Sequence, residues 1–263
     1  MYKKVSDNYH VLTNIILDLI RDKKIPPNPK ILDFGCGRCQ LIELLKKNIP
    51  SADLYGVDIY KDYNFYNEMK EKYHNLTILN IKPYQEFLVD EKFDLIISNQ
   101  VFEHINKLEL IYKFFKKIMN NSCLIIAAFP TKEIIFEPHL RIPFAHLINK
   151  DSSFLKPYLY VFNTLFELLK GNFISQNRIK LITQKNYDFC RNNIFYLNKR
   201  EHKEKMRSYF CDIFDISDEI NFYWREGKII NNFIKLIISK IPFKSIRLSL
   251  TSRLIGSLFI IKN

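Results

Sequence analysis

Apolar and polar positions along the chain fall into two alternating patterns. Short, nearly continuous apolar runs predict buried strands at residues 31–34, 54–58, 76–81, 93–100 and 123–129. Between the first two runs, apolar residues recur at helical spacing over residues 40–48, where Leu41, Ile42, Leu44 and Leu45 lie on one side. Residues 31–58 therefore predict a strand–helix–strand unit.

The turn between the first strand and this helix contains the residues most suited to binding. It reads Asp33-Phe34-Gly35-Cys36-Gly37, and its two glycines permit backbone angles and a close ligand approach that a side chain would prevent. The turn precedes a helix, whose first N–H groups lack partners within the helix. The second strand ends on Asp58, about 20 residues later, where a carboxylate can reach a ribose. The pattern predicts a nucleoside-cofactor site.

The polar residues of the turn indicate which cofactor it holds. A dinucleotide site requires a third glycine, but Gln40 occupies that position. Asp33 would repel a pyrophosphate, whereas it suits the ammonium group of an amino-acid moiety. The sequence therefore favours S-adenosylmethionine (SAM) over NAD.

At these residues the chain resembles the class I SAM-dependent methyltransferases, whose first motif is acidic-x-Gly-x-Gly-x-Gly. Cys39 replaces the third glycine of that motif. Residues 93–105, which include Glu103 and His104, also resemble the fourth strand of the family and its following segment. The resemblance implies an α/β, doubly wound, Rossmann-like sheet of seven mostly parallel strands. It also implies an antiparallel last strand, here residues 254–261, with helices on both faces.

The same resemblance implies a set of cofactor contacts at the ends of the strands and in the following turns. These are Asp33, Gly35, Cys36, Gly37, Asp58, Ile59, Ile81, Lys82, Asn99, Gln100 and His104. Asp33 and Asp58 could instead cap turns, and His104 could pack under the cofactor without contacting the reacting atoms. Tyr84 is either an adenine platform or an ordinary core residue.

The chain departs from a minimal sheet domain after the fifth strand. A charged helix at 198–208 and a strand at 210–216 are the next strong signals, so residues 131–193 are predicted to form an insertion within a single domain, 1–263. The insertion is rich in aromatic residues and emerges where open α/β folds bind their ligands. We therefore expect a helical lid that binds substrate.

One short segment of this insertion concentrates polar groups between prolines. His139 is the predicted general base, Glu137 would orient it, and Arg141 would hold a phosphate or carboxylate. His146 is a second candidate base. An equal alternative is that these residues only bind the insertion to the domain. The segment is similar to a Glu-Pro-His-x-x-x-Pro stretch in a subset of bacterial methyltransferases near surface-polysaccharide or lipid pathways.

Composition narrows the choice of compartment and partner. The five cysteines are odd in number and scattered, which favours a reducing compartment. The pair Cys36 and Cys39 lacks the second ligand pair of a zinc site, so no metal is predicted. The net charge of +12 comes from basic residues mixed with acidic ones, as on solvated faces. Nucleic acid is therefore disfavoured relative to an anionic small substrate or loose contact with an anionic lipid surface.

Two further segments bear on location. Residues 10–20 are amphipathic rather than secretory in character, and the apolar run at 229–241 is interrupted by polar residues, so we expect a cytoplasmic protein without a membrane span. The helical stripe at 225–250 favours packing on the sheet over a membrane-surface or dimer contact.

These expectations combine into one functional hypothesis. The sequence predicts a SAM-dependent O-methyltransferase that acts on a small anionic or sugar-linked metabolite in bacterial capsule or surface-polysaccharide biosynthesis. Methylation of a lipid or quinone precursor, methylation of RNA, and a non-catalytic SAM-binding partner subunit remain as alternatives.

Overall fold

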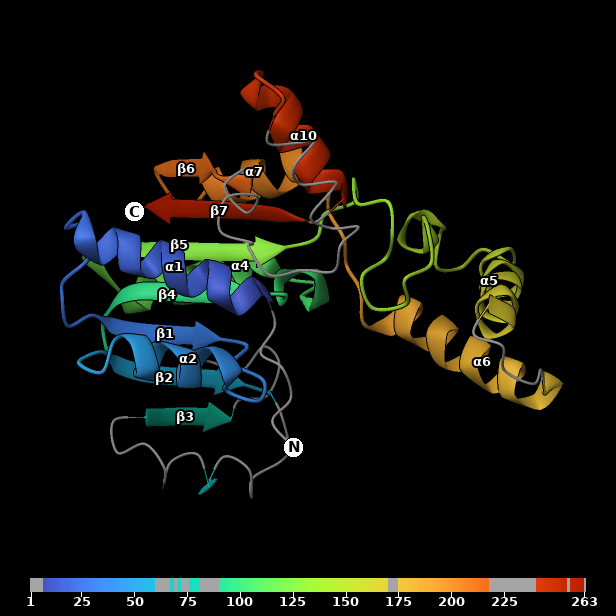
Figure 1. Ribbon diagram of the computed structural model, residues 1–263, viewed down its shortest axis with the longest axis horizontal. Coiled ribbons are helices and arrows are strands. Elements are labelled where there is room, and N and C mark those ends of the chain that lie inside the picture. Colours follow the sequence, from blue (N-terminus) through green and yellow to red (C-terminus); the bar gives the residue numbers. More distant parts are fainter. Residues whose placement is uncertain are drawn as a thin grey trace.

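A single sheet organises the structure, a computed structural model that describes residues 7–59, 67–68, 71, 76–80, 90–169, 175–217, 240–254 and 256–262. Its strands are β1 (Lys30–Phe34), β2 (Asp53–Asp58), β3 (Leu76–Asn80), β4 (Phe93–Asn99), β5 (Met119–Phe129), β6 (Asp212–Asp215) and β7 (Ser257–Lys262). Their order is β3-β2-β1-β4-β5-β7-β6, and β7 is antiparallel to both of its neighbours. The predicted doubly wound sheet with an antiparallel last strand is confirmed (Figure 1).

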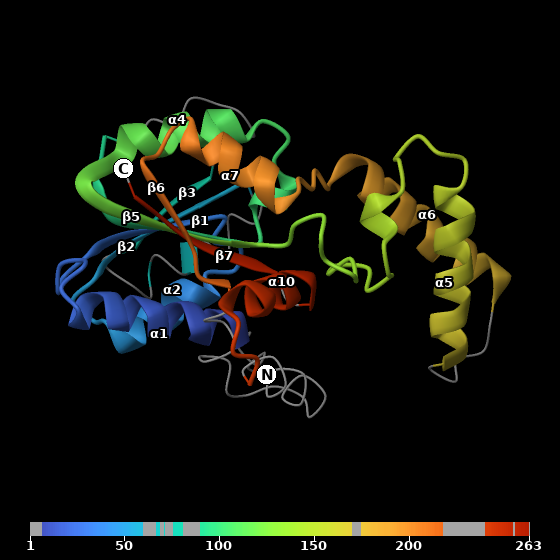
Figure 2. The same ribbon diagram turned by 90° about the horizontal axis from the view of Figure 1, so that it is seen from above.

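The central strands are apolar because both of their faces are covered. Ile31 and Leu32 of β1 are 1% exposed, and Leu95, Ile96 and Ile97 of β4 are completely buried. Helices α1 (Asp7–Arg21) and α2 (Gln40–Asn48) lie on one face of the sheet, and α4 (Leu108–Ile118) and α7 (Lys199–Arg207) on the other (Figure 2). This coverage explains the continuous apolar runs in the sequence.

The C-terminal part corrects the predicted start of the closing strand. Helix α10 (Lys244–Leu254) extends through Leu254, and Gly256, with a φ of 136°, follows it, so the closing strand begins at Ser257 rather than at residue 254. The predicted helical stripe at 225–250 falls partly on residues 218–239, which lie outside the described residues. Helix α7 begins at the predicted place because the Asn198 and Glu201 side chains form a capping box.

The segment between β5 and α7 contains the 3-10 helix η2 (Ala145–Leu147) and helices α5 (Leu155–Leu169) and α6 (Gln176–Asn192). It leaves the sheet at the carboxyl ends of the parallel strands, and α5 and α6 project away from the sheet (Figures 1 and 2). The insertion has a small core of its own, made by Ile142, Ala145, Leu155, Leu159, Cys190, Ile194 and Tyr196. The part of the insertion that lies beside the sheet therefore consists of the loop after β5 and the chain that leads back to α7. Helices α5 and α6 lie farther away.

Among the described residues, no helix is both long enough and apolar enough to span a membrane.

Candidate functional site

The glycine turn after β1 is fixed to the neighbouring strand. The backbone N–H groups of Gly35 and Cys36 both donate to the Val57 carbonyl, at 2.7 and 3.1 Å. Gly35 has a φ of 83°, and a Cβ there would lie 2.2 Å from the Val101 side chain. At Gly37, with a φ of 50°, a Cβ would meet nothing within 4 Å among the described residues, so on their side the turn leaves space where a ligand can approach.

Two carboxylates accompany the turn, as the sequence predicts. The Gly37 N–H donates to Asp58 Oδ2 at 2.7 Å. Asp33 is 4% exposed, and its pKa is raised to about 7 by burial and by the negative charge of Asp58. The turn and the ends of β1 and β2 therefore form one polar corner.

The end of β4 adds further polar atoms to this edge of the sheet. Asn99 Oδ1 and Ser98 Oγ are buried without a hydrogen-bond partner among the described residues. Gln100 has a φ of 59°, and its N–H donates to the Ala128 carbonyl at 2.7 Å. A buried oxygen without a partner is costly, so these atoms are candidates to bind a ligand.

The structure describes only some of the remaining predicted cofactor contacts. Ile59 is 55% exposed beside Asp58, whereas Ile81 and Lys82, like Tyr84, lie outside the described residues. The Cys36 thiol is buried, and its pKa is raised by a hydrogen bond with Cys39 and by burial. Cys39 has a φ of 54°, a left-handed conformation that glycine adopts more easily, and glycine is the residue of the resembled motif at this position.

Glu137 is the buried centre of a second polar cluster, in the insertion. It is completely buried, and its carboxylate accepts hydrogen bonds from His139 Nδ1 at 2.8 Å, the Tyr196 hydroxyl at 2.9 Å and the Leu140 N–H at 2.5 Å. Burial acts to raise the pKa of Glu137, but the hydrogen bonds from His139 and Leu140 hold it below its usual value. The structure therefore brings Glu137 and His139 together through a hydrogen bond.

The backbone around this carboxylate forms a tight loop. The Glu137 N–H donates to the Ile142 carbonyl at 3.1 Å, and the Arg141 N–H donates to the Glu137 carbonyl at 2.7 Å.

The His139 side chain is 31% exposed, so part of the imidazole remains accessible. The Arg141 side chain is exposed, outside the buried cluster. His146 hydrogen-bonds the Lys132 carbonyl at 3.1 Å, which ties it to the loop backbone.

The chain brings His104 to the same cluster from the 3-10 helix η1 (Phe102–His104), just after β4. The ring centroids of His104 and His139 are 4.9 Å apart, and His104 Nδ1 hydrogen-bonds the Asn193 carbonyl at 2.5 Å. Burial lowers the pKa of His104. The predicted cofactor residue His104 and the predicted base His139 therefore lie side by side.

Sequence reasoning missed two members of this cluster. Glu103 is completely buried, and burial, with the charge of Glu137, raises its pKa to about 8. Its place beside His104 in a motif was a usable signal. Tyr196 gave no such signal, because it lies 59 positions after Glu137 in the chain. Only the fold brings the two side chains together.

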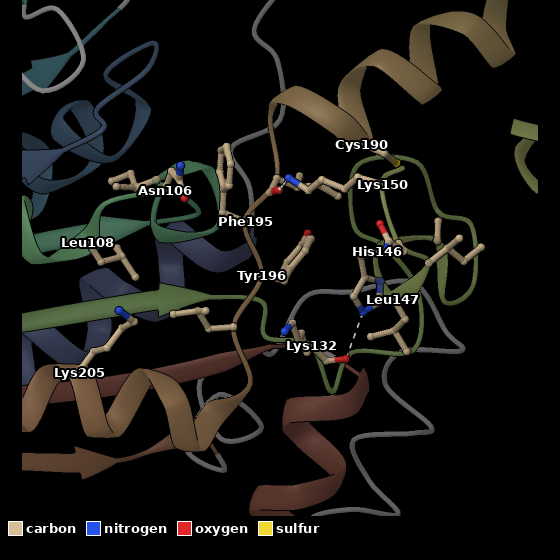
Figure 3. Close-up of a pocket in the computed structure, with 16 residues that line it drawn as sticks. Asn106, Leu108, Lys132, His146, Leu147, Lys150, Cys190, Phe195, Tyr196 and Lys205 are labelled. Atoms are coloured by element: carbon tan, nitrogen blue, oxygen red, sulfur yellow. Dashed lines mark hydrogen bonds between the residues drawn. The ribbon is translucent and has the colours of Figure 1, made fainter. Parts of the chain in front are cut away.

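A cavity of about 430 Å³ lies at the junction of the insertion and the sheet domain (Figure 3). Lys132, Lys150 and Lys205 line it together with His146 and Tyr196. Burial lowers the pKa of Lys150, whose Nζ donates to the Ile194 carbonyl at 2.5 Å. The cavity thus combines cationic groups with apolar walls.

Comparison with known proteins relates the sheet and its glycine turn to methyltransferases. A family model described as "Methyltransferase domain" matches residues 32–125. A malonyl-[acyl-carrier protein] O-methyltransferase of Bacillus cereus is 25% identical over 101 residues, 38% of this chain and 37% of that protein. A ubiquinone biosynthesis O-methyltransferase of Pelagibacter ubique is 30% identical over 122 residues, 45% of this chain and 50% of that protein. The chain thus spans half or less of the length of these relatives.

Solved structures extend the likeness in fold to the whole chain. The structure of PKMT2 from Rickettsia typhi matches with a TM-score of 0.57 at 15% identity, over 100% of this chain and 55% of that one. The plantazolicin methyltransferase BamL, solved with a triazolic desmethylPZN analogue and SAH, matches with a TM-score of 0.53 at 15% identity, over 99% and 86%. At these identities the likeness establishes the fold.

Proposed function

Because residues 32–125 match a family model of methyltransferase domains and the sheet has the fold of class I SAM-dependent methyltransferases, we propose that this chain is an O-methyltransferase that methylates a small anionic acceptor. One observation carries the proposal. His104, just after β4, and His139, from the insertion loop, lie side by side with buried carboxylates, at the edge of the sheet that also carries the glycine turn and Asp58.

S-adenosylmethionine is the cofactor, and the residues of the polar corner fit it. Asp58 would hold the ribose hydroxyls, and Asp33 would face the cationic methionine part. The open side of Gly37 leaves room for a ligand against the backbone, and Asn99 Oδ1 is a buried acceptor without a partner among the described residues. Ile59, exposed beside Asp58, would cover the adenine.

When bound, SAM supplies an electrophilic methyl group that needs no further activation. The side chains have to align the acceptor oxygen and receive its proton. Glu137 engages Nδ1 of His139, which leaves Nε2 to face an acceptor hydroxyl. In this proposal His139 accepts the hydroxyl proton, and Glu137 is the positioning residue that stabilises the resulting imidazolium, as in other carboxylate–histidine pairs.

The cationic cavity supports an anionic acceptor. Lys132 and Lys150 line it, and an anionic group bound there would meet their ammonium groups in a partly desolvated place. Arg141, exposed at the rim of the loop, can add a contact to a carboxylate or phosphate. The sugar-linked acceptor and the capsule pathway receive no support from the matched relatives, whose names refer to malonyl-[acyl-carrier protein] and ubiquinone biosynthesis.

A quinone or lipid precursor is the second candidate acceptor. The insertion exposes large apolar side chains at Phe154, Val161, Leu165, Leu168, Leu169 and Leu181. An apolar surface on the insertion would suit an acceptor whose hydrocarbon tail extends away from the sheet. The matched ubiquinone biosynthesis O-methyltransferase is consistent with this alternative.

The test begins with calorimetric titration of SAM, S-adenosylhomocysteine and NAD, in the wild type and in Asp58→Ala. We expect selective binding of the first two, weakened by the substitution. Methyl transfer is then followed by S-adenosylhomocysteine release with malonyl thioesters, phosphorylated small molecules and hydroxylated quinone precursors. Binding of NAD alone would contradict the proposal, as would cofactor binding without turnover of any of these acceptors.

A further inference from the structure

Three side chains with metal-binding atoms meet at the His104–His139 contact. Glu103 and His104 come from η1, and His139 comes from the insertion loop. One potential ligand atom from each lies within 4.8 Å of the others. These are the distances at which modest side-chain movement can place three ligands around one ion.

Both imidazoles are held in the tautomer that leaves Nε2 available to a metal ion. His139 Nδ1 is bonded to the Glu137 carboxylate at 2.8 Å, and His104 Nδ1 is bonded to the Asn193 carbonyl at 2.5 Å. A carbonyl or carboxylate oxygen can only accept, so each Nδ1 carries the proton. Each neutral ring then presents the lone pair of Nε2. Histidine ligands in metal proteins are held in the same way by outer carboxylates and carbonyls.

Glu103 supplies an independent observation. Its side chain is completely buried, and neither carboxylate oxygen has a hydrogen-bond partner within the described part of the chain. A buried carboxylate without a partner is costly, and a cation is the partner that would offset this cost. Glu103 Oε1 lies 4.0 Å from His104 Nε2. Two ligands on one ion at bonds of about 2.1 Å are about 3 to 3.5 Å apart, so the gap requires only a small contraction.

We propose that Glu103, His104 and His139 bind one divalent transition-metal ion, of which Zn²⁺ is the representative. Two imidazoles and one carboxylate suit Zn²⁺, Co²⁺ or Fe²⁺ rather than Mg²⁺ or Ca²⁺, which take oxygen ligands. Three protein ligands leave an open coordination position, as in catalytic zinc sites.

The use of the open position rests on the proposed methyltransferase function. The acceptor oxygen binds the ion there, and its hydroxyl proton is released to solvent at a lower pH than in the free acceptor. A lone pair on this oxygen then forms the bond to the methyl carbon, while the carbon–sulfur bond breaks and its electron pair stays on sulfur. In the metal-loaded protein His139 is a ligand, so it accepts the proton only in the metal-free protein.

The first experiment measures the ion without reference to activity. The chelator-treated full chain is titrated with Co²⁺, whose visible absorption reports its ligands, and Zn²⁺ is then added as competitor. We expect one bound equivalent, displaced by Zn²⁺, and an affinity reduced at least tenfold in Glu103→Gln and in His139→Ala. His146→Ala, which removes a histidine of the same insertion outside the cluster, serves as the matched control and keeps wild-type affinity.

X-ray absorption of the Zn²⁺-loaded wild type covers the case in which a cluster variant fails to fold. Nitrogen and oxygen ligands with imidazole scattering support the proposal. Thiolate ligands overturn it, because they would place the ion on cysteines. Absence of binding, or unchanged affinity in both cluster variants, overturns it as well.

A second measurement separates this proposal from the function on which its role rests. SAM binding and methyl transfer are compared in the chelator-treated and Zn²⁺-loaded protein. At least tenfold faster transfer in the loaded protein supports the role of the ion. Equal transfer rates reject that role while the methyltransferase function stands. Metal bound by the three residues without any turnover supports the site and counts against the proposed function.

Discussion

The two halves of the candidate site are built in different ways. The cofactor side, with Gly35 and Gly37, is held by hydrogen bonds within one strand–helix–strand unit, where the Gly37 N–H meets Asp58 only 21 positions later. The acceptor side depends on distant partners, because His104 meets Asn193 across 89 positions. A local motif therefore fixes the cofactor side, whereas the acceptor side forms only when the insertion docks on the sheet.

Gly35→Ala should have the largest effect on the cofactor side. Its Cβ would lie 2.2 Å from the Val101 side chain at a φ of 83°, so the turn must distort. We expect SAM affinity to fall at least about 100-fold, which corresponds to about 2.7 kcal/mol. Gly37→Ala separates the fold of the turn from the ligand space, since its Cβ meets nothing within 4 Å among the described residues: it should also weaken SAM binding, while the free energy of unfolding falls by only about 1–2 kcal/mol of backbone strain. Equal losses of unfolding free energy in the two variants, measured by urea unfolding, would contradict this account.

Glu137→Gln tests the acceptor side alone. The amide keeps the shape of the side chain but not the charge that orients His139 and binds Tyr196. We expect kcat to fall about 100-fold while SAM affinity stays within about twofold, since proton-transfer groups contribute about 10² to 10⁴. Single-turnover methyl transfer and calorimetry separate the two quantities. A parallel loss of SAM affinity would show that the two sides are not independent.

The pH dependence of SAM binding sharpens the cofactor side. The pKa of Asp33 is raised to about 7, so the cofactor-free protein holds a proton there at lower pH. A cationic ligand binds the ionised form better, and affinity should therefore fall by up to about tenfold per pH unit below 7. Because the folded pKa is raised, stability without cofactor should decline as pH rises from about 4 to about 7.

The control for this pH dependence is Asp33→Asn. It should bind SAM more weakly at pH 8 and show a nearly flat affinity between pH 6 and 8. Calorimetric titration with SAM at several pH values compares the affinity of Asp33→Asn with that of the wild type. A steep pH dependence that persists in Asp33→Asn would assign the titration to another group.

The smallest expected effect concerns His202, a buried histidine of the sheet domain that contrasts with His139. Both of its ring nitrogens lack partners among the described residues, its ring lies 4.4 Å from Phe129, and burial lowers its pKa to about 3. His202→Phe should raise stability by about 1 kcal/mol at pH 7, because an unpaired buried polar group disappears. Urea unfolding measures the change, and a loss of stability would reveal an unrecognised partner.

The same substitution has a pH signature. A histidine whose folded pKa is lowered contributes stability that is lost as pH falls from about 6.5 toward about 3. The wild type should therefore lose stability faster than His202→Phe over this interval. Parallel curves would contradict the assignment of His202 as a neutral core residue.

The five parallel strands, the glycine turn and its two carboxylates could be predicted from the amino-acid sequence, because each depends on apolar runs and on residues close in the chain. The sequence also predicted that Glu137 orients His139, two positions away. Three features required the folded structure: Glu103 is buried without a partner among the described residues, His104 and His139 are neighbours, and Tyr196 completes the Glu137 cluster. The physical reason is that such contacts join segments far apart in the chain, and local patterns carry no record of which segments meet.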